Sequence, residues 1–141
     1  MMKKIIDLYY TVWVDCITKI RNFDSFWWQY KSMMIMTFAM GVYFMIFMTI
    51  FQSYIVNNYF YYLDLKSNFI KPLASLISSF VLFFLPFLIL NYFLIFYNKK
   101  YKKLIKIYKY HNGKYVMFFF FTSMLLPILG FILLIVFDKV R

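Results

Sequence analysis

Three long stretches of this chain contain no Asp, Glu, Lys or Arg, and they limit its fold more than any other feature. They cover residues 32–56, 72–97 and 115–137, which are 25, 26 and 23 residues long. A helix needs about 20 apolar residues to cross a hydrocarbon core about 30 Å thick. The stretches also lack the polar–apolar alternation of membrane β-barrel strands. The sequence therefore predicts an all-α membrane protein with three transmembrane helices.

The composition agrees with this class of protein. Hydrophobic residues make up 65% of the chain and charged residues 15%, whereas soluble domains are about a quarter charged. The first stretch starts too far from the N-terminus for a signal peptide, and no small-residue cleavage motif follows it. We therefore expect it to be a retained transmembrane helix.

The remaining segments are short and carry the charges. We predict an N-terminal amphipathic interfacial helix over 1–31, transmembrane helices over 32–57, 72–97 and 115–137, an outer loop over 58–71, a basic helical cytoplasmic loop over 98–114 and an outer C-terminus over 138–141. Twelve of the sixteen basic residues lie in 1–31 and 98–114, and four lie in the other two segments. The positive-inside rule then places the N-terminus inside and the C-terminus outside.

The N-terminal segment has a helical period. Ile5, Leu8, Tyr9, Val12, Cys16, Ile20 and Phe23 recur at three- and four-residue steps, and Asp7, Thr11, Asp15, Thr18 and Asn22 share the other face. Such a helix lies in the membrane interface or packs on a partner helix. We expect Cys16 to be a small buried or lipid-facing residue on the apolar face, and His111 to be solvated in a turn.

The basic loop allows two conformations. The second transmembrane helix either continues as one long helix to 110, where His-Asn-Gly stops it, or bends at Asn98. In both cases an apolar stripe and the surrounding lysines are the candidate contacts for a partner protein or for lipid. These residues are Tyr101, Leu104, Ile105 and Tyr108, with Lys99, Lys102, Lys103 and Lys106.

Small and hydroxyl residues within the apolar stretches indicate where helices pack closely. The candidates are Ala74, Ser75, Ser78 and Ser79, together with Thr37 and Gly41. Pro86 and Pro127 are expected to kink their helices.

The residue types argue against several kinds of site. Met36-x-x-x-Met40 resembles an element of three-span copper transporters, but the accompanying motifs of that family are missing, so packing is the favoured role. The single His and single Cys have no carboxylate cluster beside them, so we predict no metal, cofactor or catalytic site. The lysine-rich loop has no Arg for bidentate contacts, so we predict no nucleic-acid binding.

Two segments carry a resemblance to known proteins. "DLYYTVWVDCITKIR", and "LNYFLIFYNKKYKKLI" leading into "HNGKY", resemble small polytopic bacterial inner-membrane proteins of unassigned function. The resemblance implies a bacterial inner membrane and no particular activity. The Phe-, Tyr-, Lys- and Asn-rich composition also resembles proteins of AT-rich genomes, including mitochondrial respiratory subunits, so a mitochondrial inner membrane is the alternative.

Two functions fit these features. The first is a non-catalytic accessory or scaffolding subunit of a larger membrane complex, with other integral membrane subunits and anionic lipids of the cytoplasmic face as partners. The second is a self-associating membrane-active protein, such as a holin-like pore or an immunity or exclusion protein. An enzyme is disfavoured because acid, base and nucleophile side chains are missing from the apolar stretches.

Overall fold

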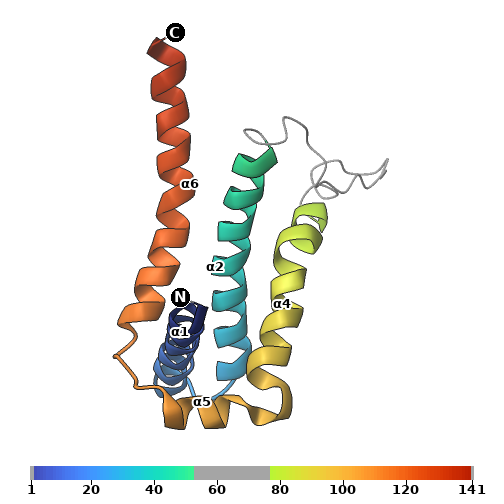
Figure 1. Ribbon diagram of the computed structural model, residues 1–141, viewed down its shortest axis with the longest axis vertical. Helices are drawn as coiled ribbons and strands as arrows, with labels where there is room; N and C mark the ends of the chain where they lie inside the picture. The colour runs from blue at the N-terminus through green and yellow to red at the C-terminus, as the bar shows by residue number, and fades with distance from the viewer. Residues whose placement is uncertain (1, 53–76, 141) are drawn as a thin grey trace.

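The regular secondary structure is helical throughout the residues that the computed structural model describes, which are 2–52 and 77–140. The main helices are α1 (Met2–Phe23), α2 (Trp28–Ile50), α4 (Leu85–Asn91), α5 (Tyr101–Ile107) and α6 (Lys114–Val140). Figure 1 shows α2, α4 and α6 standing upright, with α1 seen nearly end-on between the lower parts of α6 and α2 and with α5 lying across the lower end. We call this end, made of α1, α5 and residues 108–113, the base.

Two helices in the described part of the chain are long and apolar enough to cross a membrane. One is α2, and the other is the continuous helical stretch Ile77–Lys99, which contains α4. A third helix, α6, is also apolar and carries Pro127 in its interior. The all-helical prediction is therefore confirmed for residues 2–52 and 77–140, together with two helices of transmembrane length.

The stretch Ile77–Lys99 is not a regular α-helix. It contains two π-helical segments, Phe80–Phe84 and Tyr92–Phe96, on either side of α4. Pro86 lies two residues after the end of the first segment and has no N–H to donate to the carbonyl four residues earlier. The backbone N–H of Leu85 instead bonds to the carbonyl of Phe80, five residues back. The proline thus coincides with a π-helical turn.

The second helix does not run on to residue 110. Asn98 and Lys99 have φ angles of 53° and 56°, in the left-handed region, and they turn the chain before α5 begins. Of the two conformations that the sequence allows, the structure has the bend at Asn98. Asparagine tolerates this region better than most residues, which explains its place at the turn.

The buried core lies at the base. It consists of Val12, Trp13, Cys16 and Ile17 from α1, Met36 from α2, Ile95, and Val116 from α6. Residues 12–17 of α1 are all buried, so the middle of this helix is enclosed on every side. The expected polar face is therefore absent there, and Asp15, which the pattern assigns to it, is fully buried.

Gly41 marks the closest approach between α2 and the stretch Ile77–Lys99. A Cβ atom added to Gly41 would lie 2.6 Å from Cδ1 of Phe84 and 3.0 Å from the carbonyl oxygen of Phe83. A Cβ added to Gly130 of α6 would meet no atom within 4 Å. The two glycines thus differ in packing although both lie within helices.

We predict that Gly41→Ala lowers the free energy of unfolding by about 1–3 kcal/mol, because the methyl group forces the two helices apart. The matched control Gly130→Ala should be neutral or stabilising by up to about 1 kcal/mol, because alanine favours the helix. Thermal unfolding followed by circular dichroism in a mild detergent measures both. Equal stability of the two variants would contradict the close contact at Gly41.

Candidate functional site at the base of the helices

The apolar stripe predicted on α5 packs against the chain's own core. Tyr101, Leu104 and Ile105 are half-buried and contact the core cluster. The ring centroid of Tyr101 lies 5.2 Å from that of Trp28 and 6.1 Å from that of Phe96, and the Trp28 pair has an edge-on geometry. Contact of these three side chains with a partner or with lipid remains a prediction.

Tyr108 ends the stripe and joins it to the first half of α1. Its hydroxyl donates a hydrogen bond to Oδ1 of Asp7 over 2.9 Å, and its ring centroid lies 5.6 Å from that of Tyr10. The hydrogen bond to Asp7 raises the pKa of Tyr108, because it stabilises the protonated hydroxyl. Residue 108 thus fixes the end of α5 to α1.

The lysines of α5 and of the preceding turn face away from the core, unlike the apolar stripe. Lys99, Lys102, Lys103 and Lys106 are all exposed. Because apolar side chains of α5 contact the core, the helix presents its ammonium groups outward. These four lysines are therefore accessible to an acidic partner surface or to lipid phosphates.

Asp15 connects α1 to the start of α6. Its Oδ1 accepts a hydrogen bond from the backbone N–H of His111 over 2.6 Å, and its Oδ2 accepts one from the backbone N–H of Tyr115 over 3.0 Å. Amides in the first turn of a helix have no carbonyl partner within the helix. A carboxylate at this position supplies an acceptor and complements the helix dipole. Asp15 therefore caps α6 from a helix about a hundred residues earlier in the chain.

The turn before α6 lies directly against α1. Asn112 and Gly113 have φ angles of 58° and 78°. A Cβ on Gly113 would lie 3.1 Å from side-chain carbons of Lys19, whose Nζ donates to Oδ1 of Asn112 over 3.5 Å. Both the backbone conformation and the limited space thus favour glycine at position 113.

A chain of polar contacts joins α1, α4 and α2. The hydroxyl of Tyr9 donates to Oδ1 of Asn91 over 2.8 Å, and Nδ2 of Asn91 donates to Oγ1 of Thr37 over 3.2 Å. Asn91 is fully buried, so these bonds offset the cost of removing its amide from water. Burial also raises the pKa of Tyr9 to about 12. Because each hydrogen bond is directional, these contacts fix the position along each helix at which α1, α4 and α2 meet.

The residues predicted to pack helices together are placed as follows. Thr37, Gly41 and Ser78 are buried and Ser79 is half-buried, while Ala74 and Ser75 lie outside the described residues. Thr37 contacts Asn91, and Gly41 faces Phe84. The two α2 residues therefore meet an amide and a ring of the stretch Ile77–Lys99, not a second small side chain.

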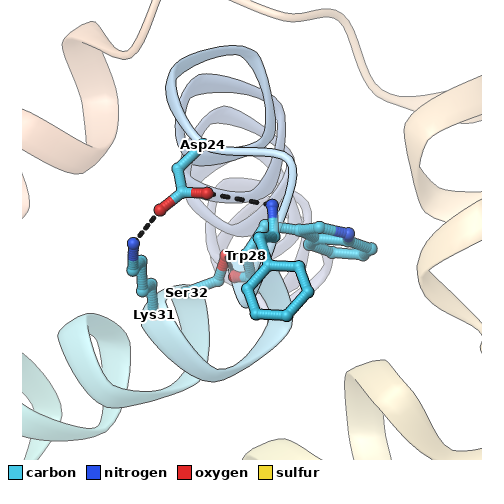
Figure 2. A network of polar contacts seen from close by, with 5 residues as sticks. Asp24, Trp28, Lys31 and Ser32 are labelled. Carbon is cyan, nitrogen blue, oxygen red and sulfur yellow. Dashed lines mark hydrogen bonds and ion pairs between the residues drawn. The ribbon is translucent and has the colours of Figure 1, made fainter.

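The turn between α1 and α2 has its own polar network, shown in Figure 2. The carboxylate of Asp24 accepts a hydrogen bond from the backbone N–H of Phe26 over 2.9 Å and pairs with the ammonium of Lys31. Ser32 donates from its hydroxyl to the carbonyl of Trp28 over 2.6 Å. The hydrogen bond from Lys31 lowers the pKa of Asp24.

A groove of about 670 Å³ opens beside this turn, and we call it the turn groove. Its lining comes from the end of α1, the turn and the start of α2. The lining residues are Lys19, Ile20, Phe23, Asp24, Tyr30, Lys31, Met34 and Ile35.

Cys16 and His111 have different surroundings. Cys16 is fully buried, its Sγ lies 3.8 Å from the carbonyl oxygen of Ser32, and burial raises the pKa of its thiol to about 12. His111, expected in a solvated turn, is half-buried, with its ring centroid 4.8 Å from that of Tyr115. Among residues 2–52 and 77–140, no three His, Cys, Asp or Glu side chains gather closely enough to hold a metal ion.

Sequence reasoning missed the role of Asp15, a buried polar residue that holds α1 to the start of α6. For Asp15 a signal was present. It stands within the apolar run 12–17, and α6 begins after Gly113 without a Ser, Thr or Asp directly before it. The first amides of α6 therefore needed an acceptor from elsewhere in the chain.

Comparison with known proteins gave no relative: no family model, no curated protein and no solved structure matches this chain.

We predict that Asp15→Asn lowers the free energy of unfolding by about 1–3 kcal/mol, because the amide nitrogen of Asn cannot accept one of the two backbone hydrogen bonds. Denaturation in a mild detergent, followed by circular dichroism, measures the loss. The matched control is Asp7→Asn, whose partner is the rotatable hydroxyl of Tyr108. A larger loss in the control than in Asp15→Asn would contradict the capping role.

We predict that Cys16, the single cysteine, stays unmodified by maleimide at pH 9 in a mild detergent and reacts at once after denaturation. Burial holds its thiol protonated up to a pH of about 12, whereas the ordinary value is 9.0. The same shift should make the folded state lose stability as the pH rises from about 9 toward 12, since only the unfolded thiol ionises there.

A matched control carries the thiol at an exposed position. Ser25 is exposed in the turn, so Ser25→Cys in a Cys16→Ser background should react at pH 9 at least about 100-fold faster. Similar rates at the two positions would contradict the burial of Cys16.

Proposed function

We propose that this chain is a non-catalytic accessory or scaffolding subunit of a larger integral membrane complex, and that it crosses the membrane three times. The crossings would be α2, Ile77–Lys99 and α6. The first two have the required length and apolar character. The 27 residues of α6 extend about 40 Å, more than the hydrocarbon thickness, and its charged residues lie only near its two ends.

The distribution of lysine and arginine supports an orientation with the base in the cytoplasm. The N-terminal segment and the segment 98–114 carry twelve of the sixteen basic residues, and both belong to the base. The N-terminus would lie inside and the C-terminus outside. A bacterial inner membrane is the proposed location, with the mitochondrial inner membrane as the alternative.

The observation that carries the function is the exposed apolar face of α6. Its members recur at three- and four-residue steps and are about half exposed or more. They are Phe118, Phe121, Leu125, Ile128, Leu129 and Ile132. The opposite face, which bears Val116 and Ser123, is buried against the rest of the chain. The exposed face is continuous over four turns and has the spacing by which helices pair side by side.

We therefore propose that a transmembrane helix of another subunit packs on this face of α6. The base would provide a second contact through the exposed lysines Lys99, Lys102, Lys103 and Lys106. Their partners would be acidic side chains or the phosphates of anionic lipids, each lysine contributing about 1 kcal/mol near an anionic surface. The two contacts lie on different parts of the chain, which suits a subunit that holds others in place.

We predict that gentle detergent extraction of native membranes yields the chain in a complex much heavier than its own 17.4 kDa. The double variant Phe121→Ala/Leu125→Ala should lose most of the co-extracted partner, because it removes side-chain packing from the exposed face of α6. The measurement is native electrophoresis with identification of the co-extracted chains.

The matched control is Leu90→Ala/Phe93→Ala, which truncates two similarly exposed residues of the stretch Ile77–Lys99. This variant should keep the complex. Extraction of the wild type as a lone monomer would overturn the proposal. A heavy species that contains only this chain would instead establish the self-associating alternative, since a second copy fits the same face.

A further inference from the structure

The turn groove has two kinds of lining, and they lie at different depths along α2. Lys19 and Lys31 are exposed, whereas Ile20 and Ile35 are half-buried and pack against the core cluster. Met34 and Ile35 follow Lys31 by three and four residues, which is about one helical turn, or roughly 5.4 Å, further along α2. Near the base the groove carries the ammonium groups of Lys19 and Lys31 against the carboxylate of Asp24, which leaves a net positive charge, and toward the upright part of the helix it is apolar.

The two ammonium groups have hydrogen-bonding capacity to spare in the described contacts. An ammonium has three donors. Lys19 donates to Asn112 and Lys31 pairs with Asp24. The carboxylate of Asp24 is itself shared between Lys31 and the backbone N–H of Phe26, so its charge is compensated locally. Further N–H groups of both lysines are thus available to the oxygens of one phosphate.

The groove also lies where a membrane has its headgroups, if the proposed topology holds. Exposed aromatic side chains surround the turn: Phe23 is 93% exposed, Phe26 72%, Tyr30 62% and Trp27 59%. Trp and Tyr favour the headgroup region, where the ring is partly buried in lipid and the polar atom is wet. In Figure 1, α1 is seen nearly end-on between the lower parts of α6 and α2, so it runs across the direction of the upright helices, as an interfacial helix does.

From this arrangement we propose that the turn groove is a specific site for one anionic phospholipid. The phosphate is held between Lys19 and Lys31, and the adjoining acyl chain lies along Met34 and Ile35. The order of the two linings, cationic and then apolar in the direction of the hydrocarbon, matches the order of headgroup and chain in such a lipid. This inference rests on the proposed membrane function, and it places one specific lipid in the groove, separate from any lipid phosphates at the lysines of α5.

The test uses the full chain in nanodiscs of phosphatidylcholine that contain a rising fraction of brominated phosphatidylglycerol. Bromine quenches nearby tryptophans, and Trp27 and Trp28 lie at the turn. We expect half-maximal quenching at an at least about fivefold lower fraction of brominated phosphatidylglycerol than of brominated phosphatidylcholine. The double variant Lys19→Gln/Lys31→Gln should reduce this preference to below about twofold.

The matched control is Lys102→Gln/Lys103→Gln, which removes the same charge from α5 and should keep the preference. Inertness of Cys16 to maleimide checks that each variant retains its fold. Equal loss of the lipid preference in both variants would overturn the site and would indicate an effect of diffuse surface charge. Absence of any lipid preference in the wild type would also overturn it. The accessory function is tested separately by the mass of the complex extracted from native membranes. A lone monomer with an intact lipid preference would overturn that function and leave the lipid site standing.

Discussion

The hydrogen bonds of Asp15 determine how α1 and the start of α6 come together. A carboxylate at the centre of a buried helix is costly unless its oxygens find donors. Here the donors are the backbone amide of His111, in the turn before α6, and that of Tyr115, in the first turn of α6, where an amide has no carbonyl partner within the helix. The carboxylate gains hydrogen-bond donors and the amides gain acceptors. Separating α1 from the start of α6 would therefore leave both sets of polar groups unpaired. The tight turn at Gly113 allows the approach.

Around this contact the base packs with the lower parts of α2, of the stretch Ile77–Lys99 and of α6. Trp13 is fully buried, and the ring of Phe96 packs edge-on against it with 5.8 Å between centroids. The polar chain from Tyr9 through Asn91 to Thr37 then ties the base to α2 and α4 at one depth. Higher up, α6 keeps only a narrow buried face against the rest of the chain. The lower contacts therefore fix the directions of the upright helices, and the upper surfaces remain available for other molecules.

The sequence predicted the parts of this structure that depend on local pattern. Uncharged stretches of about 25 residues locate α2, Ile77–Lys99 and α6, because lack of charge and length are visible without tertiary information. At Asn98 the pattern allowed both a straight helix and a bend, since an asparagine inside a helix and one in a left-handed turn look alike in a sequence. The structure has the bend. Pro86 was expected to disturb its helix, and a π-helical segment lies there.

What the sequence could not predict depends on contacts between distant residues. Periodicity assigned Asp15 to a polar face turned toward water, because the pattern of a single helix does not reveal that α6 will cover that face. The same limit applies to Gly41, whose small size matters only because Phe84 lies against it. The small-residue pattern identified Gly41 as a packing position, and the space beside it is filled by an aromatic ring that the pattern does not name.

The segment 98–114 contains apolar and basic residues that alternate in the sequence and have different roles in the structure. Its apolar residues Tyr101, Leu104 and Ile105 contact the core, so they stabilise the base. Its lysines are exposed and contribute to orientation through their charge. Since α1 and α5 meet through the apolar set, the lysines are held outward at fixed positions and are not free to fold back over an apolar surface. The basic residues thus form a stable cationic surface because the neighbouring apolar side chains are already engaged within the chain.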